Sequence, residues 1–169
     1  MQVIKSVLSE DLVHNSVTLL DELLKTNRWV SSNFIWPKGA LRGVSGSCIS
    51  TRVPAVLHDL IEGEIKQHLP EYERLTTCFY VWERLSGLGM HEDEGYKFNA
   101  TIYLNEDWDP DFGGALIWEE KETEDTGIYN CIFPEKGWMA LNVGEKKHLV
   151  TNISPQAPEP RRTIQIRGY

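Results

Sequence analysis

Apolar residues in the first part of the chain recur at helical spacing in two separate segments. Over residues 11–29 they return every three or four positions, which predicts a helix with one apolar face, and Ser9 or Asp11 stands where its N-cap belongs. A second segment opens at Pro54, a residue suited to the first turn of a helix, and ends at Pro70. The apolar positions of the two expected helices are Leu12, Val13, Val17, Leu19, Leu20, Leu23, Leu24, Val56, Leu57, Leu60, Ile61, Ile65 and Leu69.

After Pro70 the pattern changes to short apolar stretches separated by turn residues, which is typical of β-strands. We expect strands over residues 75–85, 96–104, 115–119, 128–133, 138–143, 148–153 and 163–167. Because no long helical pattern separates them, they favour an antiparallel sandwich or barrel. We expect one domain over residues 1–169, with helical support in residues 1–70 and a β core in residues 71–169. The Gly- and Ser-rich residues 31–50 are expected to form a loop between the helices.

Net charge and cysteine content indicate which binding partners and which cellular compartment are favoured. The formal net charge of −8 repels phosphate backbones, so nonspecific binding of nucleic acid is disfavoured. The three cysteines are far apart and odd in number, which argues against a disulfide framework or a cysteine zinc site and favours a reducing compartment. Neither a signal-peptide pattern nor a stretch of about 20 apolar residues is visible. We therefore expect a cytoplasmic protein without a membrane partner.

Three of the five histidines, His14, His58 and His68, lie in the helical part. We interpret them as polar-face or half-buried helix residues. His58 and Glu62 are four positions apart, a spacing that can hold a metal but more often makes a solvated pair on a helix.

His91 and Asp93 differ from these, because they lie two positions apart between two expected strands. In extended chain, residues i and i+2 point to the same side, so the two side chains converge while Glu92 turns away. Two histidines and one carboxylate on one face of a metal mark nonhaem iron(II) oxygenases. The only histidine after His91 is His148. His91, Asp93 and His148 are therefore the predicted metal ligands and catalytic residues.

The stretch that starts with this pair, HEDEGYKFNATIYLNEDWDPDFGGALIW, continues with a Tyr-Leu-Asn triplet, a tryptophan and a Gly-Gly pair. These are Tyr103-Leu104-Asn105, Trp108 and Gly113-Gly114. FPEKGWMALNVGEKKHLV then leads to the distal histidine, and PRRTIQIRGY closes the chain with a candidate arginine strand. Taken together, residues 77–168 resemble the prolyl 4-hydroxylase-like branch of the Fe(II)/2-oxoglutarate-dependent oxygenase superfamily.

The resemblance implies a fold and a reaction. The fold would be mainly β with N-terminal supporting helices, a double-stranded β-helix (jelly-roll). The reaction would use Fe(II), 2-oxoglutarate and O₂, with ascorbate as an optional reductant, to hydroxylate a peptidyl (prolyl) side chain while succinate and CO₂ are released. The alternatives are the same mechanism on a free small molecule or a nucleobase, and a noncatalytic jelly-roll binding module. The acidic net charge disfavours the nucleobase.

The resemblance also implies an arginine for the far carboxylate of 2-oxoglutarate, and a bidentate guanidinium suits that group. On a strand, Arg161 and Thr163 share one face, whereas Arg162 shares the other with two isoleucines. A polar cavity favours the first face, so we prefer Arg161 with Thr163 beside it, and Arg162 stays open as the alternative. The resemblance adds Tyr103 as a further contact to the co-substrate.

Other residues of these motifs are expected to have structural roles. Trp108 and the Gly-Gly pair would shape a turn and a tight strand start, and Trp82, Trp118 and Trp138 would form core or cavity wall. Loops over residues 31–50, 85–90 and 120–126 would contact the primary substrate, since such loops vary most within a fold. The sequence identifies neither that substrate nor an oligomeric state.

Overall fold

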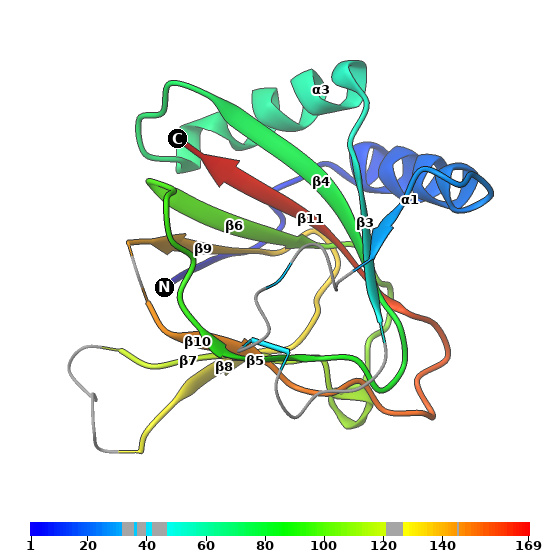
Figure 1. Ribbon diagram of the computed structural model, residues 1–169. Helices are drawn as coiled ribbons and strands as arrows, with labels where there is room; N and C mark the ends of the chain where they lie inside the picture. The colour runs from blue at the N-terminus through cyan, green and yellow to red at the C-terminus, as the bar shows by residue number, and fades with distance from the viewer. Residues whose placement is uncertain (32–35, 37–39, 42–46, 121–126, 145) are drawn as a thin grey trace.

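The computed structural model describes residues 1–31, 36, 40–41, 47–120, 127–144 and 146–169. In this part of the chain two antiparallel β-sheets face each other (Figure 1). The larger sheet has the order β1–β9–β6–β11–β4–β3–β2, and the smaller has the order β5–β10–β7–β8. The strands of the larger sheet are β1 (Gln2–Ile4), β2 (Val30–Ser31), β3 (Cys48–Arg52), β4 (Leu75–Trp82), β6 (Phe98–Tyr103), β9 (Met139–Val143) and β11 (Arg161–Gly168). Those of the smaller sheet are β5 (Leu88–His91), β7 (Leu116–Trp118), β8 (Asn130–Ile132) and β10 (His148–Val150).

From β4 onward the chain passes repeatedly from one sheet to the other. β4, β6, β9 and β11 belong to the larger sheet, and β5, β7, β8 and β10, which lie between them in sequence, belong to the smaller. This winding produces a double-stranded β-helix, so the expected mainly-β jelly-roll with N-terminal helices is confirmed.

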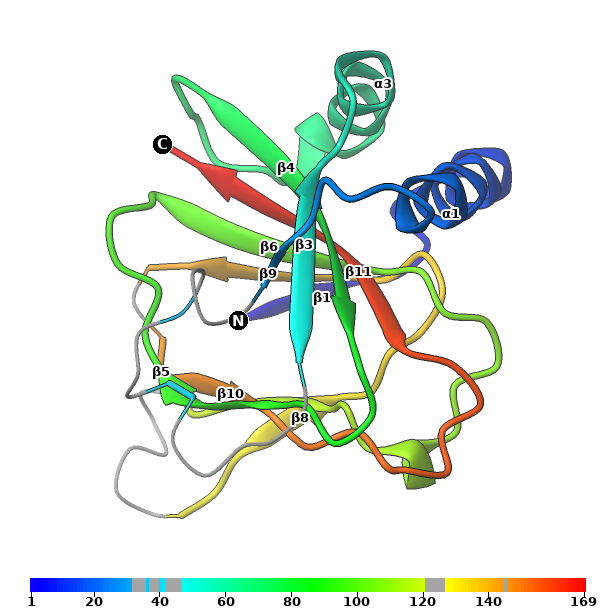
Figure 2. The ribbon, with the colours of Figure 1, turned by 45° about the vertical axis from the view of Figure 1, so that its right-hand side comes forward.

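Two helices, α1 (Glu10–Leu24) and α3 (Ala55–Ile65), cover the outer face of the larger sheet (Figures 1 and 2). The cap of α1 is Ser9, whose side chain accepts a hydrogen bond from the Leu12 N–H. The helix ends at Leu24, earlier than expected, because the side chains of Thr26 and Trp29 donate to the Leu23 carbonyl. A 3₁₀ turn, η1 (Lys66–His68), extends α3, and a second one, η2 (Pro110–Phe112), precedes β7. No helix in the described residues is long and apolar enough to cross a membrane.

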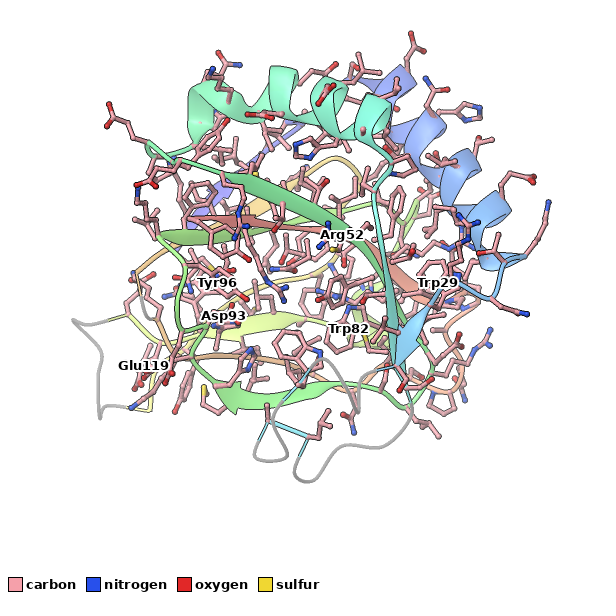
Figure 3. All side chains as sticks on the ribbon, turned by 45° about the horizontal axis from the view of Figure 1, so that its top comes forward. Trp29, Arg52, Trp82, Asp93, Tyr96 and Glu119 are labelled. Carbon is pink, nitrogen blue, oxygen red and sulfur yellow. The ribbon has the colours of Figure 1, made fainter. Side chains whose placement is uncertain are left out.

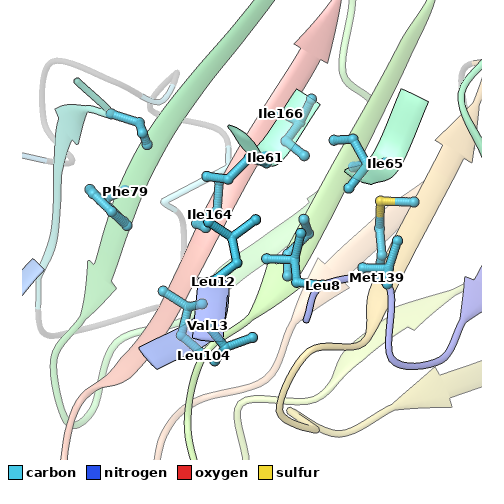
Figure 4. Close-up of a cluster of buried hydrophobic side chains, with 14 of the residues drawn as sticks. Leu8, Leu12, Val13, Ile61, Ile65, Phe79, Leu104, Met139, Ile164 and Ile166 are labelled. Carbon is cyan, nitrogen blue, oxygen red and sulfur yellow. The ribbon is translucent and has the colours of Figure 1, made fainter. Parts of the chain in front are cut away.

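Between the helices and the sheet lies one hydrophobic core (Figure 4). Ile164 and Ile166 of β11 point outward into it, as strand parity predicts. From the helices come Leu12, Val13, Leu20, Leu57, Ile61 and Ile65. The inner face of the larger sheet forms a second cluster against the smaller sheet, which includes Tyr80, Trp82, Tyr103, Trp108 and Trp118.

Three of the apolar positions on the expected helices lie outside the core. Leu24, Val56 and Leu60 are exposed, with 36%, 77% and 55% of their surface accessible. In α3 the side that meets the sheet is set by Leu57, Ile61 and Ile65, which follow each other at four-residue spacing. Their neighbours in sequence are rotated by about 100° around the helix and therefore face solvent.

Four strands were missed by the sequence pattern: β1, β2, β3 and β5. β3 pairs with β4 along its length, with Ile49 opposite Val81. Its residues CISTR show no strong apolar alternation, and β propensity depends on the neighbouring strand more than on the segment itself. Residues 1–70 therefore supply strands of the larger sheet as well as its supporting helices.

Candidate metal centre

His91 at the end of β5 and His148 at the start of β10 are direct partners across the smaller sheet. Their ring centroids are 4.3 Å apart. Asp93 follows two positions after His91, and its carboxylate oxygens lie 3.8 Å from Nε2 of His91 and 3.4 Å from Nε2 of His148. One ligand atom from each of the three lies within 4.8 Å of the others. The structure thus brings together the three residues that the sequence singles out as ligands.

The backbone orients both imidazole rings. Nδ1 of His91 lies 2.8 Å from the Gly89 carbonyl oxygen, and Nδ1 of His148 lies 2.8 Å from the Lys146 carbonyl oxygen. In a neutral ring Nδ1–H donates to that carbonyl, so the lone pair of Nε2 points toward Asp93. Nε2 of His91 is buried and has no hydrogen-bond partner among the described residues. A bound cation would satisfy this nitrogen.

The protonation states of His91 and Asp93 also suit a cation. Burial lowers the pKa of His91, and the neighbouring His148 lowers it further. Burial is the largest single influence on Asp93 and His148 and opposes the charged form of each. The hydrogen bond between them and the surrounding charges and backbone contacts together outweigh it, so the pKa of Asp93 falls and that of His148 rises. A neutral His91 and an ionised Asp93 are the forms that bind a metal, and a metal would displace the Nε2 proton through which His148 pairs with Asp93.

Arg161 opens β11 inside the barrel and is 2% exposed. Its guanidinium carbon lies 5.6 Å from the Trp82 ring centroid and 5.2 Å from that of Tyr103. Burial lowers the pKa of Arg161, and the described groups that favour its charge are Tyr103 and Cys48, neither of them a carboxylate. A buried cation without an anion is costly, so the surroundings of Arg161 favour an anionic ligand.

Further polar atoms near Arg161 are also unpaired. Nε of Arg161, the Tyr103 hydroxyl and Oγ1 of Thr163 are buried and have no hydrogen-bond partner within the described residues. Thr163 lies directly opposite Tyr103 in the pairing of β11 with β6. These three residues, which the sequence selects for the co-substrate, therefore form one set of unused donors.

Arg162 points to the opposite face. Its guanidinium lies 3.1 Å from Asp21 of α1 and 3.6 Å from Glu159. Its backbone N–H donates to Oδ1 of Asn105 over 2.7 Å, and Asn105 donates in turn to Glu159 and to the Pro160 carbonyl. Asn105, which the sequence analysis named in a motif without giving it a role, thus joins the end of β6 to the start of β11 and helps to set which arginine faces inward.

The Gly-Gly pair leaves room for Arg161. Gly113 and Gly114 both have a φ of 68°, a left-handed conformation that favours glycine. A Cβ at Gly114 would lie 2.9 Å from Cδ of Arg161, and one at Gly113 would lie 2.3 Å from the Asn152 carbonyl oxygen. Trp108 donates its indole N–H to the Gly113 carbonyl over 2.9 Å. These residues shape the turn, as the sequence suggests.

Sequence reasoning also missed residues beside the candidate ligands. Arg167 lies farther along β11, donates to the Tyr80 hydroxyl over 3.1 Å and lies 5.1 Å from the Tyr96 ring centroid. Its charge contributes to the low pKa of Asp93. The Trp36 ring lies edge-on, 5.3 Å from that of His91. Strand parity places Arg167 on the same face as Arg161, whereas its contacts with Tyr80 and Tyr96 depend on how the strands pair.

Other candidates lie away from this centre. His58 pairs with Glu62 at 3.4 Å and with the Thr77 hydroxyl at 2.9 Å, an ordinary helix-surface arrangement. Among the expected substrate loops, residues 32–35, 37–39, 42–46 and 121–126 lie outside the described residues. The expected loop at residues 85–90 becomes strand β5 from Leu88 onward.

No family model matches the chain, and no curated relative does either. Solved structures are similar over its whole length. A prolyl-4-hydroxylase from Pseudomonas putida superposes with a TM-score of 0.77 at 18% identity, over 99% of this chain and 91% of that one. The chain has the fold of the 2-oxoglutarate- and iron(II)-dependent oxygenases.

Two further structures share this fold. One is a prolyl hydroxylase from Trichoplax adhaerens in complex with a hypoxia inducible factor peptide fragment, with a TM-score of 0.73 at 14% identity over 99% of this chain and 82% of that one. The other is the epimerase SnoN in complex with Fe³⁺, α-ketoglutarate and nogalamycin RO, with a TM-score of 0.69 at 14% identity over 98% and 77%. At these identities the likeness shows the fold.

Proposed function

We propose that the chain is an iron(II)- and 2-oxoglutarate-dependent dioxygenase that hydroxylates a primary substrate and releases succinate and CO₂. The observation that carries the proposal is the joint presence of two matched sites in one barrel. His91, Asp93 and His148 form a metal-sized cluster, and Arg161 is a buried cation without a carboxylate partner in the described residues. A two-histidine, one-carboxylate set leaves coordination positions open for a co-substrate and O₂.

The ligand residues hold and orient the metal. The carbonyls of Gly89 and Lys146 fix each ring so that Nε2 is available, and Asp93 supplies a hard anionic oxygen between the two rings. The orphaned Nε2 of His91 supports the fit. When bound, iron supplies the redox chemistry that couples O₂ and 2-oxoglutarate to substrate oxidation.

Arg161, Tyr103 and Thr163 bind the co-substrate in this proposal. The guanidinium takes the far carboxylate of 2-oxoglutarate, and the two hydroxyls donate to the same group. All three carry buried polar atoms with no partner in the described residues, so a bound carboxylate would satisfy them together. The rings of Trp82 and Tyr103 lie against the Arg161 guanidinium and shield it from water, which strengthens its hydrogen bonds to a bound carboxylate.

For the primary substrate we propose a peptidyl, prolyl-like side chain. The sequence resemblance and the fold likeness to two prolyl hydroxylases support it. The second candidate is a free small molecule, which the likeness to SnoN with nogalamycin RO supports. The net charge of −8 disfavours nucleic acid.

The test is succinate release from 2-oxoglutarate by the full chain under air, with and without Fe(II) and ascorbate, and with panels of prolyl peptides and small molecules. We expect Fe(II)-dependent release that a substrate stimulates. Iron binding by calorimetry, run in parallel under nitrogen, separates the possibilities. Iron and 2-oxoglutarate binding without turnover on any panel would point to a noncatalytic jelly-roll, and failure to bind either would overturn the proposal.

A further inference from the structure

Two cavities, of about 470 and 320 Å³, adjoin each other at β3, β4 and β11. The larger lies on the inner side of these strands, and the smaller extends toward α3, where His58 also lines it. Both are lined by Arg52, Cys78 and Arg167, and the larger also by Arg28. We call the two together the arginine groove. In Figure 3 Asp93 and Tyr96 lie close together, and Arg52 lies at some distance from both.

The groove is cationic on a protein of net charge −8. Its lining includes three arginines and no aspartate or glutamate side chain. Within the described residues the ion pairs that form at up to 4.0 Å involve other cations such as Arg162, and none involves Arg28, Arg52 or Arg167. Unpaired arginines gathered in a concave surface indicate an anionic ligand.

Arg52 and Arg167 lie together beside Cys78, which lines both cavities with them. Burial raises the pKa of the Cys78 thiol, whereas the charges of both arginines oppose that rise, so both guanidinium groups lie near this thiol. Nε of Arg167 is buried without a partner among the described residues, although Nη2 donates to Tyr80. The two arginines therefore leave donors for a shared oxyanion.

Arg167 extends the groove toward the candidate ligands. Its guanidinium carbon lies 5.1 Å from the ring centroid of Tyr96, which follows Asp93 by three residues. The groove is built from other residues than those proposed for 2-oxoglutarate. Arg161, Tyr103 and Thr163 line neither cavity, and the Cα of Arg161 lies six residues, about 20 Å along a strand, from that of Arg167.

We propose that the primary substrate carries an oxyanion, a carboxylate or a phosphate, which Arg52 and Arg167 bind while Arg28 attracts it from the outer end. This anchoring would place the remainder of the substrate beside His91, Asp93 and His148. That this anionic molecule is a substrate rests on the proposed oxygenase function, but binding of an oxyanion in the groove does not. The groove thus selects acidic molecules among the peptides and small molecules considered above.

The test uses benzoate, phenyl phosphate and neutral benzamide, because aromatic rings match the tyrosines beside the groove. Each is titrated, by ligand-observed NMR, into metal-free protein and into protein with Mn(II) and saturating 2-oxoglutarate under nitrogen. We expect either anion to bind in both forms and benzamide to bind at least tenfold more weakly. Benzoate and phenyl phosphate separate the carboxylate from the phosphate source.

Arg52→Gln should raise the anion Kd about three- to fivefold, since it is an exposed contact, and Arg28→Gln/Arg52→Gln should raise it further. Arg162→Gln removes the same charge from the outer face of β11 and should leave the Kd within about twofold. Equal binding of benzamide, or equal loss in Arg162→Gln, would overturn the proposal. Because the metal-free arm needs no turnover, an absent activity with intact anion binding would count against the oxygenase function alone.

Discussion

Arg161 crosses over the bare Cα of Gly114: a Cβ at that glycine would lie 2.9 Å from Cδ of the arginine. The contact joins the turn before β7 to the start of β11. Glycine is needed at this position for two reasons. The φ of 68° disfavours any side chain, and the arginine occupies the space that a side chain would fill. The position of Arg161 therefore depends on a residue that never touches the proposed ligand.

Gly114→Ala should raise the Michaelis constant for 2-oxoglutarate about tenfold, because Arg161 must shift to make room for the methyl group. Steady-state succinate release at varied 2-oxoglutarate measures this. Gly127→Ala is the matched control, since Gly127 has a φ of 74° and nothing within 4 Å of its added Cβ. Both variants carry the backbone strain of about 1 kcal/mol, but only the first should change co-substrate binding. Equal Michaelis constants in the two variants would contradict the packing argument.

Arg161→Ala should weaken the binding of 2-oxoglutarate by about tenfold or more, because a charge-assisted hydrogen bond contributes roughly 1.5–3 kcal/mol. Arg162→Ala should have little effect on it, since Arg162 pairs with Asp21 and Glu159 on the outer face. Calorimetric titration of 2-oxoglutarate into Mn(II)-loaded protein measures both. The reverse order would mean that β11 presents the other face inward, and equal small effects would remove the 2-oxoglutarate assignment.

His91→Ala, Asp93→Ala or His148→Ala should each abolish Fe(II)-dependent turnover and weaken metal binding by about a hundredfold, while the fold persists. Far-ultraviolet circular dichroism checks the fold, and anaerobic calorimetry with Fe(II) checks the affinity. His14→Ala, at an exposed position of α1, is the control and should bind iron normally. Unchanged iron affinity in His148→Ala would show that the three residues do not act as one site.

Asn105→Ala should lower the free energy of unfolding by about 2 kcal/mol, because it leaves the Arg162 N–H and the Pro160 carbonyl without their partner in a buried place. Urea unfolding measures the loss. We also expect a higher Michaelis constant for 2-oxoglutarate, since Asn105 holds the residue next to Arg161. Asn130→Ala, an exposed change on β8, should alter neither quantity. A destabilised Asn105→Ala with normal 2-oxoglutarate affinity would limit Asn105 to a stabilising role.

Much of this protein follows from local pattern. The spacing of apolar residues predicts both helices, the β-rich remainder and the outward direction of Ile164 and Ile166. The His-x-Asp pair and the single later histidine identify the candidate ligands, because period-two geometry acts within a few residues and needs no tertiary information. The sequence pattern predicts less well which helix side chains are buried. Val56 and Leu60 are apolar and yet exposed, since only packing decides which side of a helix meets the sheet.

Only the tertiary structure determines features that bring together segments far apart in sequence. Parity separates Arg161 from Arg162, but only the position of β11 between β4 and β6, with helices over one face, decides which of them is inside. The same pairing carries Arg52 of β3 to Arg167 of β11, across 115 residues of sequence, and so forms a cationic groove on an acidic chain. No local pattern contains that convergence, because strand neighbours are chosen by the burial and hydrogen bonding of the whole sheet.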